Sequence, residues 1–136
     1  MSQQHDSRFS STDWGFLLDD VCRLRGVRGA IAASADGMLQ AHHHLEQDVA
    51  ETLAASTSGM SSLANATAKV LGRGLVTRTL IEYQGGYLFV DTVNDLWILA
   101  VVAGHDSDIG QVGYEMNRLA AAAGEALKPA ARTPAR

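Results

Sequence analysis

The segment LWILAVVA, residues 96–103, constrains the fold of this chain more than any other stretch. It contains only aliphatic side chains and one tryptophan, so a strand of this sequence has two apolar faces. A half-exposed strand alternates apolar and polar residues, whereas a strand covered on both faces does not need to. The sequence therefore predicts a strand at the centre of a sheet, with other elements packed on both sides of that sheet.

Four other segments have the residues and length of strands. The five predicted strands are residues 27–34, 38–44, 75–83, 86–93 and 96–103. The pairs Asp36-Gly37, Gly85-Gly86 and Asn94-Asp95 separate neighbouring strands, and all three favour tight turns. In the first pair both residues are expected at positive φ, as the favoured two-residue hairpin requires.

Apolar residues at helical spacing predict a helix near each end of the domain. The first begins with a cap at residues 10–12, ends at Gly26, and has the apolar residues Trp14, Leu17, Leu18 and Val21. The last begins with a capping box of Asp108 and Gln111, and its apolar stripe is Ile109, Val112, Met116, Leu119, Ala123 and Leu127. With a helix at residues 46–72, the order is αββαβββα. This order predicts an α+β fold in which helices cover an antiparallel five-stranded sheet.

Length and charge limit the classes of protein to consider. We expect one domain at residues 10–128, with flexible tails at residues 1–9 and 129–136. The net charge of −4, without a Lys/Arg cluster, argues against nucleic-acid partners and membrane insertion. Cys22 is the single cysteine and the first residues lack an apolar segment, so we expect a cytoplasmic protein.

Three consecutive histidines, His42, His43 and His44, are the first candidates for a metal site. On a strand His42 and His44 project from one face and His43 from the other, so only two could share an ion. Neither an HExxH motif nor a paired Cys/His spacing supplies further ligands. We interpret them as polar residues that protect an edge strand; a metal site and a tag remnant are the alternatives.

The other candidate residues have structural interpretations. Without a GxxxxGK[ST] motif the chain is not itself a P-loop GTPase or ATPase. Cys22 is interpreted as a small buried hydrophobe rather than a reactive thiolate. Asp19-Asp20 and Asp106/Asp108 are interpreted as a solvated helix face and a helix cap rather than acid–base pairs. We therefore expect a non-enzymatic protein without cofactor or metal.

The helix at residues 46–72 has no charged side chain between Glu51 and Lys69. Its predicted apolar face is Val49, Leu53, Ser56, Met60, Leu63, Thr67 and Val70. Beside that face lies a flank of small residues, Ala55, Gly59, Ser62 and Ala66. The residues that point away are Glu51, Ser58, Asn65 and Lys69. Small residues let two backbones approach closely, so the flank predicts contact with a second helix; close packing on the chain's own sheet is the alternative.

Together these patterns resemble the bacterial roadblock family of dynein light chain-like domains. The resemblance covers roughly Asp13 to Leu127 and is carried by VRGAIAASADGM, LAASTSGMSSLANATAKVLGRG, YQGGYLFV and IGQVGYEMNRLAAAAGEAL. The sequence is similar to roadblock proteins of actinobacterial operons that also encode a small GTPase and a sensor histidine kinase. The resemblance implies a profilin-like sandwich and a homodimer whose sheets join across a two-fold axis, with the second helices side by side.

The resemblance also implies a function: a homodimeric adaptor or regulator that binds a Ras-like small GTPase in bacterial signalling, modulates its nucleotide cycle and connects to a sensor histidine kinase system. We place the dimer contact at Ala55, Gly59, Ser62, Ala66, Thr79 and Ile81. We place the partner contact at Glu51, Ser58 and Asn65. One alternative is a small-molecule sensor of profilin-like or PAS-like type, with a ligand between sheet and helices. Another is a metal-dependent enzyme that uses His42 and His44.

Overall fold

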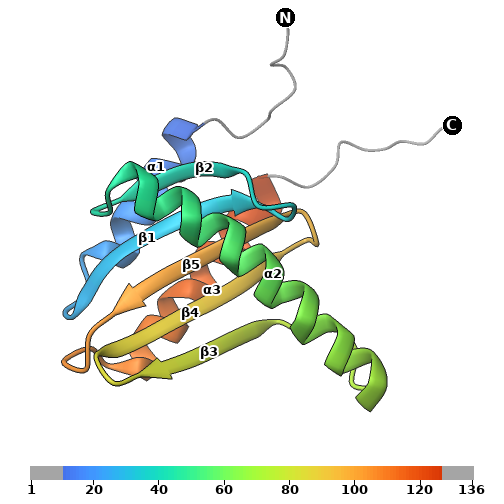
Figure 1. The fold of residues 1–136 in the computed structure, drawn as a ribbon. Coiled ribbons are helices and arrows are strands. Elements are labelled where there is room, and N and C mark those ends of the chain that lie inside the picture. Colours follow the sequence, from blue (N-terminus) through green and yellow to red (C-terminus); the bar gives the residue numbers. More distant parts are fainter. Residues whose placement is uncertain (1–10, 127–136) are drawn as a thin grey trace, which may run out of the picture.

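The computed structural model describes residues 11–126, which form three helices and a five-stranded sheet (Figure 1). The helices are α1 (Ser11–Cys22), α2 (Gln47–Leu71) and α3 (Ile109–Ala126), and the strands are β1 (Val27–Ser34), β2 (Leu39–His43), β3 (Arg78–Tyr83), β4 (Gly86–Val93) and β5 (Trp97–Ala103). The predicted α+β fold with the order αββαβββα is confirmed. The predicted tails at 1–9 and 129–136 and the stripe residue Leu127 lie outside the described residues.

The sheet is antiparallel and has the strand order β2-β1-β5-β4-β3. β5 lies in the middle, where Val101 pairs with Ala30 of β1 on one side and Phe89 of β4 on the other. The central strand predicted from LWILAVVA is therefore confirmed. β2 and β3 form the two edges of the sheet within the described residues.

Helices cover the sheet on both faces (Figure 1). α2 crosses one face over β2, β1 and β5, and α1 and α3 lie on the other. Side chains alternate along β5, so Leu99 and Val101 join the core under α1 and α3, with Trp14 and Met116. Ile98 and Ala100 face the smaller core under α2. This arrangement explains why β5 is apolar on both faces.

The turns differ in part from the predicted ones. Asn94 and Asp95 lie in the turn between β4 and β5, as predicted, and both have positive φ, 56° and 59°. At Asp36-Gly37 only Gly37 has a positive φ, of 95°, so the expectation for Asp36 is wrong. The register shifts after Ala32, and this bulge leaves a longer turn that the side chain of Ser34 stabilises by accepting the Met38 N–H at 3.1 Å.

Several element ends differ by a few residues from the prediction. α1 ends at Cys22, four residues before Gly26, which has a φ of 86°. β3 begins at Arg78 rather than at residue 75, and β2 ends before His44, whose φ of 62° takes the chain out of the strand. Asp108 caps α3, since its Oδ1 accepts the N–H of Gln111 at 3.1 Å. Within residues 11–126 the Gln111 side chain makes no return bond, so the capping box is only half formed.

The face on which α2 packs is not the predicted one. Ala50, Ala54 and Thr57 are its buried residues, and the Thr57 hydroxyl is satisfied by donating to the carbonyl of Leu53 at 2.9 Å. Within the predicted apolar face, Leu53 and Met60 are half-buried, whereas Val49, Leu63 and Val70 are 50%, 72% and 86% exposed. Small side chains let α2 lie close on the sheet, and this turns several of its bulky residues to solvent.

Candidate interaction surface

The predicted flank of small residues on α2 faces solvent. All four of its members, Ala55, Gly59, Ser62 and Ala66, are exposed. A Cβ built on Gly59 would meet no atom within 4 Å. The alternative in which these four residues pack on the chain's own sheet is therefore wrong, because Ala50, Ala54 and Thr57 do so instead.

The exposed face of α2 has the spacing by which helices pair. Its residues recur at alternating steps of three and four, the pattern of a coiled-coil contact line. This α2 seam consists of Val49, Thr52, Ser56, Gly59, Leu63, Ala66 and Val70, all exposed. Small side chains occupy the middle of the seam and bulkier apolar ones lie towards its ends. An uncharged exposed face of this kind is typical of a surface that another protein covers.

β3 adds an unpaired strand edge to this surface. It pairs only with β4 among the described strands. Ile81 packs on the core under α2, and Thr79, two residues away, faces the same side. Both side chains are half-buried. A strand edge that is rich in β-formers favours pairing with another strand.

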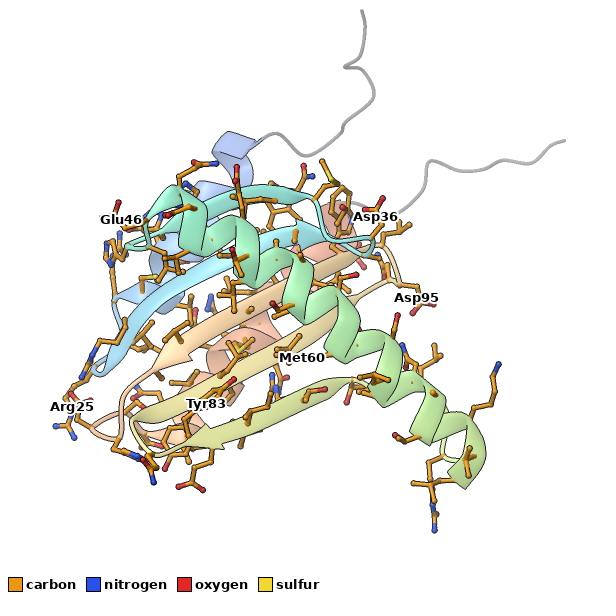
Figure 2. All side chains as sticks on the ribbon, viewed as in Figure 1. Arg25, Asp36, Glu46, Met60, Tyr83 and Asp95 are labelled. Carbon is orange, nitrogen blue, oxygen red and sulfur yellow. The ribbon has the colours of Figure 1, made fainter. Side chains whose placement is uncertain are left out.

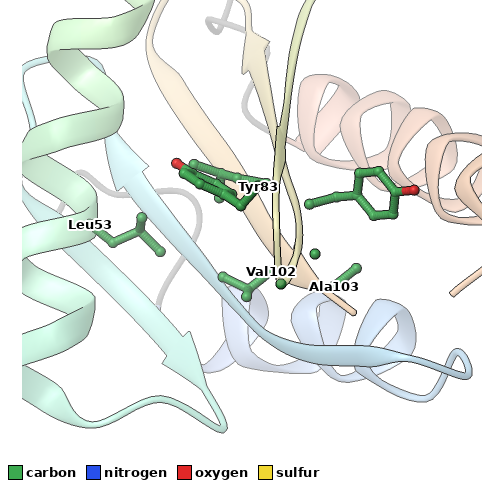
Figure 3. A pocket seen from close by; sticks show the side chains of 8 residues that line it. Leu53, Tyr83, Val102 and Ala103 are labelled. Carbon is green, nitrogen blue, oxygen red and sulfur yellow. The ribbon is translucent and has the colours of Figure 1, made fainter. Parts of the chain in front are cut away.

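A shallow pocket lies between the first half of α2 and the strands β3 to β5 (Figure 3). It has a volume of about 260 Å³, and its lining includes Leu53, Tyr83, Leu88 and Val102. Tyr83 is 50% exposed, so α2 leaves this part of the sheet uncovered. The volume lies below the roughly 300–1,000 Å³ that is usual for small-molecule pockets.

The predicted outward direction of two partner-contact residues is wrong. Ser58 donates to the carbonyl of Ala35 at 2.7 Å, and Asn65 Oδ1 accepts the N–H of Val76 at 3.2 Å. Both are half-buried on the side of α2 that faces the β1–β2 turn and the loop before β3. Ser58 and Asn65 were expected to point outward because they lie opposite the predicted apolar face, but that face is not the one that packs on the sheet. Glu51 is exposed as expected and accepts a hydrogen bond from the neighbouring Gln47 at 2.8 Å.

His42 and His43 make hydrogen bonds within the chain, whereas His44 has a ring contact with His43. The ring of His42 lies 3.0 Å from both the Leu45 carbonyl oxygen and Gln47 Oε1. His43 Nε2 lies 3.1 Å from Asp19 Oδ1. Among residues 11–126, no group of three His, Cys, Asp or Glu side chains is arranged to hold a metal ion. None of the helices in the described part of the chain has the length and apolarity to cross a membrane.

Other titratable residues are held by nearby groups. Burial, together with the charge of Asp19, raises the pKa of the Cys22 thiol from 9.0 to about 11. The hydrogen bond from Arg28, 2.9 Å long, lowers the pKa of Asp106. A low-pKa thiolate is what nucleophilic cysteine chemistry needs, and the shift at Cys22 has the opposite sign.

The sequence did not single out an ion pair at the other side of the sheet. Asp91 is 3% exposed on β4, and Arg78 of β3 donates to both its oxygens at 2.6 and 2.7 Å. Arg78 also donates to the Gly113 carbonyl and to Asn117 Oδ1 of α3, at 3.1 and 3.0 Å. The signal was an aspartate within the apolar run GYLFVDTV. The pair joins the edge strand to α3, and the bond to Asp91 raises the pKa of Arg78.

Comparisons with known proteins agree with this architecture. The profile of the Roadblock/LC7 domain family matches residues 14–103. A Roadblock/LC7 domain from Streptomyces avermitilis is 32% identical, covers 82% of this chain and 95% of its own, and superposes with a TM-score of 0.78. MglB from Myxococcus xanthus, 15% identical, covers 99% of this chain and 98% of its own with a TM-score of 0.84. The gliding protein MglB from Thermus thermophilus is 22% identical over 85% of this chain and 89% of its own, with a TM-score of 0.77.

These two MglB structures share the fold with this chain. No protein among the curated sequences matches it.

Proposed function

Because the chain belongs to the Roadblock/LC7 domain family, we propose that it is a homodimeric, non-enzymatic adaptor that binds a Ras-like small GTPase in bacterial signalling. The observation that carries the proposal is the α2 seam, an exposed helix face with the spacing of a helix-pairing surface. A cytoplasmic location follows from this role, since Ras-like GTPases act there.

The dimer is proposed to form through α2 and β3 together. A two-fold axis brings the same surface of both copies together, and with that axis perpendicular to α2 each α2 seam meets the other in antiparallel direction. The small residues near Gly59 then lie where the two backbones approach most closely. Joining the two β3 edges satisfies backbone groups that the monomer leaves unpaired. The proposed contact therefore comprises the seam together with the residues predicted from the sequence, of which Ala55 and Ser62 lie beside the seam: Ala55, Gly59, Ser62, Ala66, Thr79 and Ile81.

The partner is proposed to bind beside the seam rather than on it. Glu51 is exposed at the edge of the uncharged surface, where a charged rim residue steers association and suits a protein contact. Ser58 and Asn65 would meet a partner only through the groove that they border. The small volume of the pocket in Figure 3 favours this role over that of a sensor whose ligand binds in that pocket.

Two measurements test the proposal. Light scattering after size exclusion should give a mass near twice 14.5 kDa at micromolar concentration. Ras-like GTPases of the same organism, purified and loaded with GDP or a non-hydrolysable GTP analogue, should bind the immobilised dimer in at least one nucleotide state. Glu51→Lys should weaken this binding by about five-fold or more and leave the mass unchanged.

Glu125→Lys, on the opposite face of the sheet, is the matched charge reversal and should have no effect on GTPase binding. A chain that binds none of these GTPases in either nucleotide state would contradict the proposed partner. A monomeric chain would contradict the proposed assembly.

A further inference from the structure

We propose that a groove beside α2 binds an arginine side chain presented by a partner protein. The groove has a volume of about 350 Å³ and lies between α2, the loop before β3 and the β4–β5 turn. The inference rests on the proposed function only in that a partner protein supplies the arginine. It does not require that this partner be a GTPase.

The free polar groups of the groove favour a cationic ligand. Ser58, Asn65 and Thr92 are already engaged, with the Thr92 hydroxyl donating to the Val76 carbonyl at 3.1 Å. Within residues 11–126 no hydrogen bond or ion pair engages the side chains of Ser61 and Asp95, which also line the groove; Ser62 lines it too but belongs to the proposed dimer contact. Outside the proposed dimer contact, the lining thus offers one carboxylate and one hydroxyl oxygen as acceptors, and it contains no lysine or arginine.

The apolar part of the groove suits the stem of a long side chain. Leu75 lines it and is 69% exposed, and Ile98 belongs to the core behind it. Arginine buries an aliphatic stem against such a surface while its charged head stays with polar groups. Its planar guanidinium has five donors in a fixed fork that matches a carboxylate, whereas lysine is a point charge. The combination of Leu75, Asp95 and Ser61 therefore favours arginine.

The position of Asp95 strengthens the argument. It occupies the second position of the β4–β5 turn at a φ of 59°, where glycine is the usual residue and a side chain costs conformational energy. Asp36, in the β1–β2 turn, lies at the same end of the sheet (Figure 2) but does not line the groove. It adds negative potential nearby, which attracts a cation without fixing its position.

The experiment uses the full chain in its native assembly and the peptide Ac-Ala-Ala-Arg-Ala-Ala-amide. The control peptide has citrulline, which keeps the shape of arginine and lacks its charge. In amide-resolved NMR titrations the arginine peptide should cause saturable shifts at Ser61, Leu75 and Asp95, with a millimolar dissociation constant as expected for one anchoring side chain. The citrulline peptide should bind at least about five-fold more weakly.

Two variants locate the effect. Asp95→Asn should weaken the arginine peptide by at least about five-fold, and the turn should be retained because asparagine adopts positive φ readily. Asp36→Asn is the control of equal charge change and should alter affinity by less than about two-fold. The melting temperature and oligomeric mass of both variants are measured to show that the fold is retained.

The proposal is overturned by equal binding of both peptides, by shifts away from the groove, by an unaffected Asp95→Asn, or by no saturable shift up to about 10 mM peptide. If the arginine peptide binds as described while no GTPase is captured, the arginine site is supported and the proposed GTPase partner is contradicted. If a GTPase is captured while the arginine peptide shows no preference over citrulline, the proposed function stands and the groove is rejected.

Discussion

At the scale of single residues, Arg78 and Asp91 are the pair on which the edge strand depends. Asp91 is almost fully buried, and Arg78 is its bidentate partner. Arg78→Met keeps the length of the side chain and leaves a buried carboxylate unpaired, which costs about 3–5 kcal/mol. Urea unfolding at a fixed protein concentration measures the loss.

The matched control for this pair is Arg23→Met. Arg23 bonds Asp19 at 2.7 Å in a pair whose arginine side chain is 69% exposed, and exposed pairs contribute about 0–1 kcal/mol. The double variant Arg78→Met/Asp91→Leu should recover most of the stability, since it removes the stranded charge as well. A loss below about 1 kcal/mol for Arg78→Met alone would show that water reaches Asp91.

Cys22 gives a pH dependence with a defined sign. Its pKa rises from 9.0 to about 11 on folding because burial disfavours the thiolate, with a further contribution from Asp19. A raised pKa stabilises the folded chain fully below pH 9.0, and this contribution is lost as the pH rises towards about 11. The unfolding free energy of the native chain should therefore fall more steeply between these pH values than that of Cys22→Ala. Parallel curves for the two proteins would contradict the burial of the thiol.

At the scale of elements, the sequence predicted which segments form helices and strands better than it predicted how they face. Strands could be recognised because turn pairs such as Asn94-Asp95 separate one apolar run from the next. The central strand β5 could be recognised because it lacks polar residues. The orientation of α2 was misjudged because hydrophobic periodicity weights bulky residues such as Leu63 and Val70. In the structure Ala50 and Ala54 make the close contact between α2 and the sheet. How closely a helix approaches a sheet depends on small side chains, and a hydrophobicity pattern does not record this.

The candidate surface was predictable to the same degree. The exposed flank around Gly59 could be inferred from the long run without charged residues. A helix face exposed to water normally carries charge, so an uncharged face indicates contact with another protein segment. The groove could not, since Ser61, Leu75 and Asp95 come from three segments that only the fold brings together. The predicted outward direction of Ser58 was wrong because it was taken as opposite to the predicted apolar face. Since that face is not the buried one, the direction inferred from it for Asn65 is wrong as well.

The end of α2 depends on one glycine conformation. Gly72 caps the helix at φ 63°, with its N–H directed to the carbonyl of Lys69 at 3.3 Å. Gly72→Ala should lower the unfolding free energy by about 1 kcal/mol, because a Cβ disfavours the left-handed conformation. No atom lies within 4 Å of the added Cβ, so the cost is conformational. Gly15→Ala in α1, equally free of neighbours, should instead leave stability unchanged or raise it; equal losses in both variants would count against this account.

At the scale of the whole molecule, the sheet has one well-covered face and one that is covered in part. α1 and α3 lie over the first face, whereas α2 leaves β3 and the pocket at Tyr83 open on the second (Figures 1 and 3). The unpaired β3 edge and the uncharged α2 seam belong to this same side of the molecule. In the proposed dimer, a second copy related by a two-fold axis would pair the β3 edge and cover the α2 seam together, so a substitution in the seam tests the assembly.

Gly59→Leu separates the stability of the chain from that of the dimer. Leucine forms helices better than glycine, and no atom lies within 4 Å of its Cβ position, so the fold of one chain should be kept or strengthened. Between two chains, the branched side chain overpacks the seam at a typical cost of about 1–3 kcal/mol per site, and two-fold symmetry applies the cost twice. Light scattering should give a mass near twice 14.5 kDa for the native chain and near 14.5 kDa for the variant. Gly15→Leu, the same change on α1, should remain a dimer; a native monomer or a stable Gly59→Leu dimer would show that α2 does not pair through its small residues.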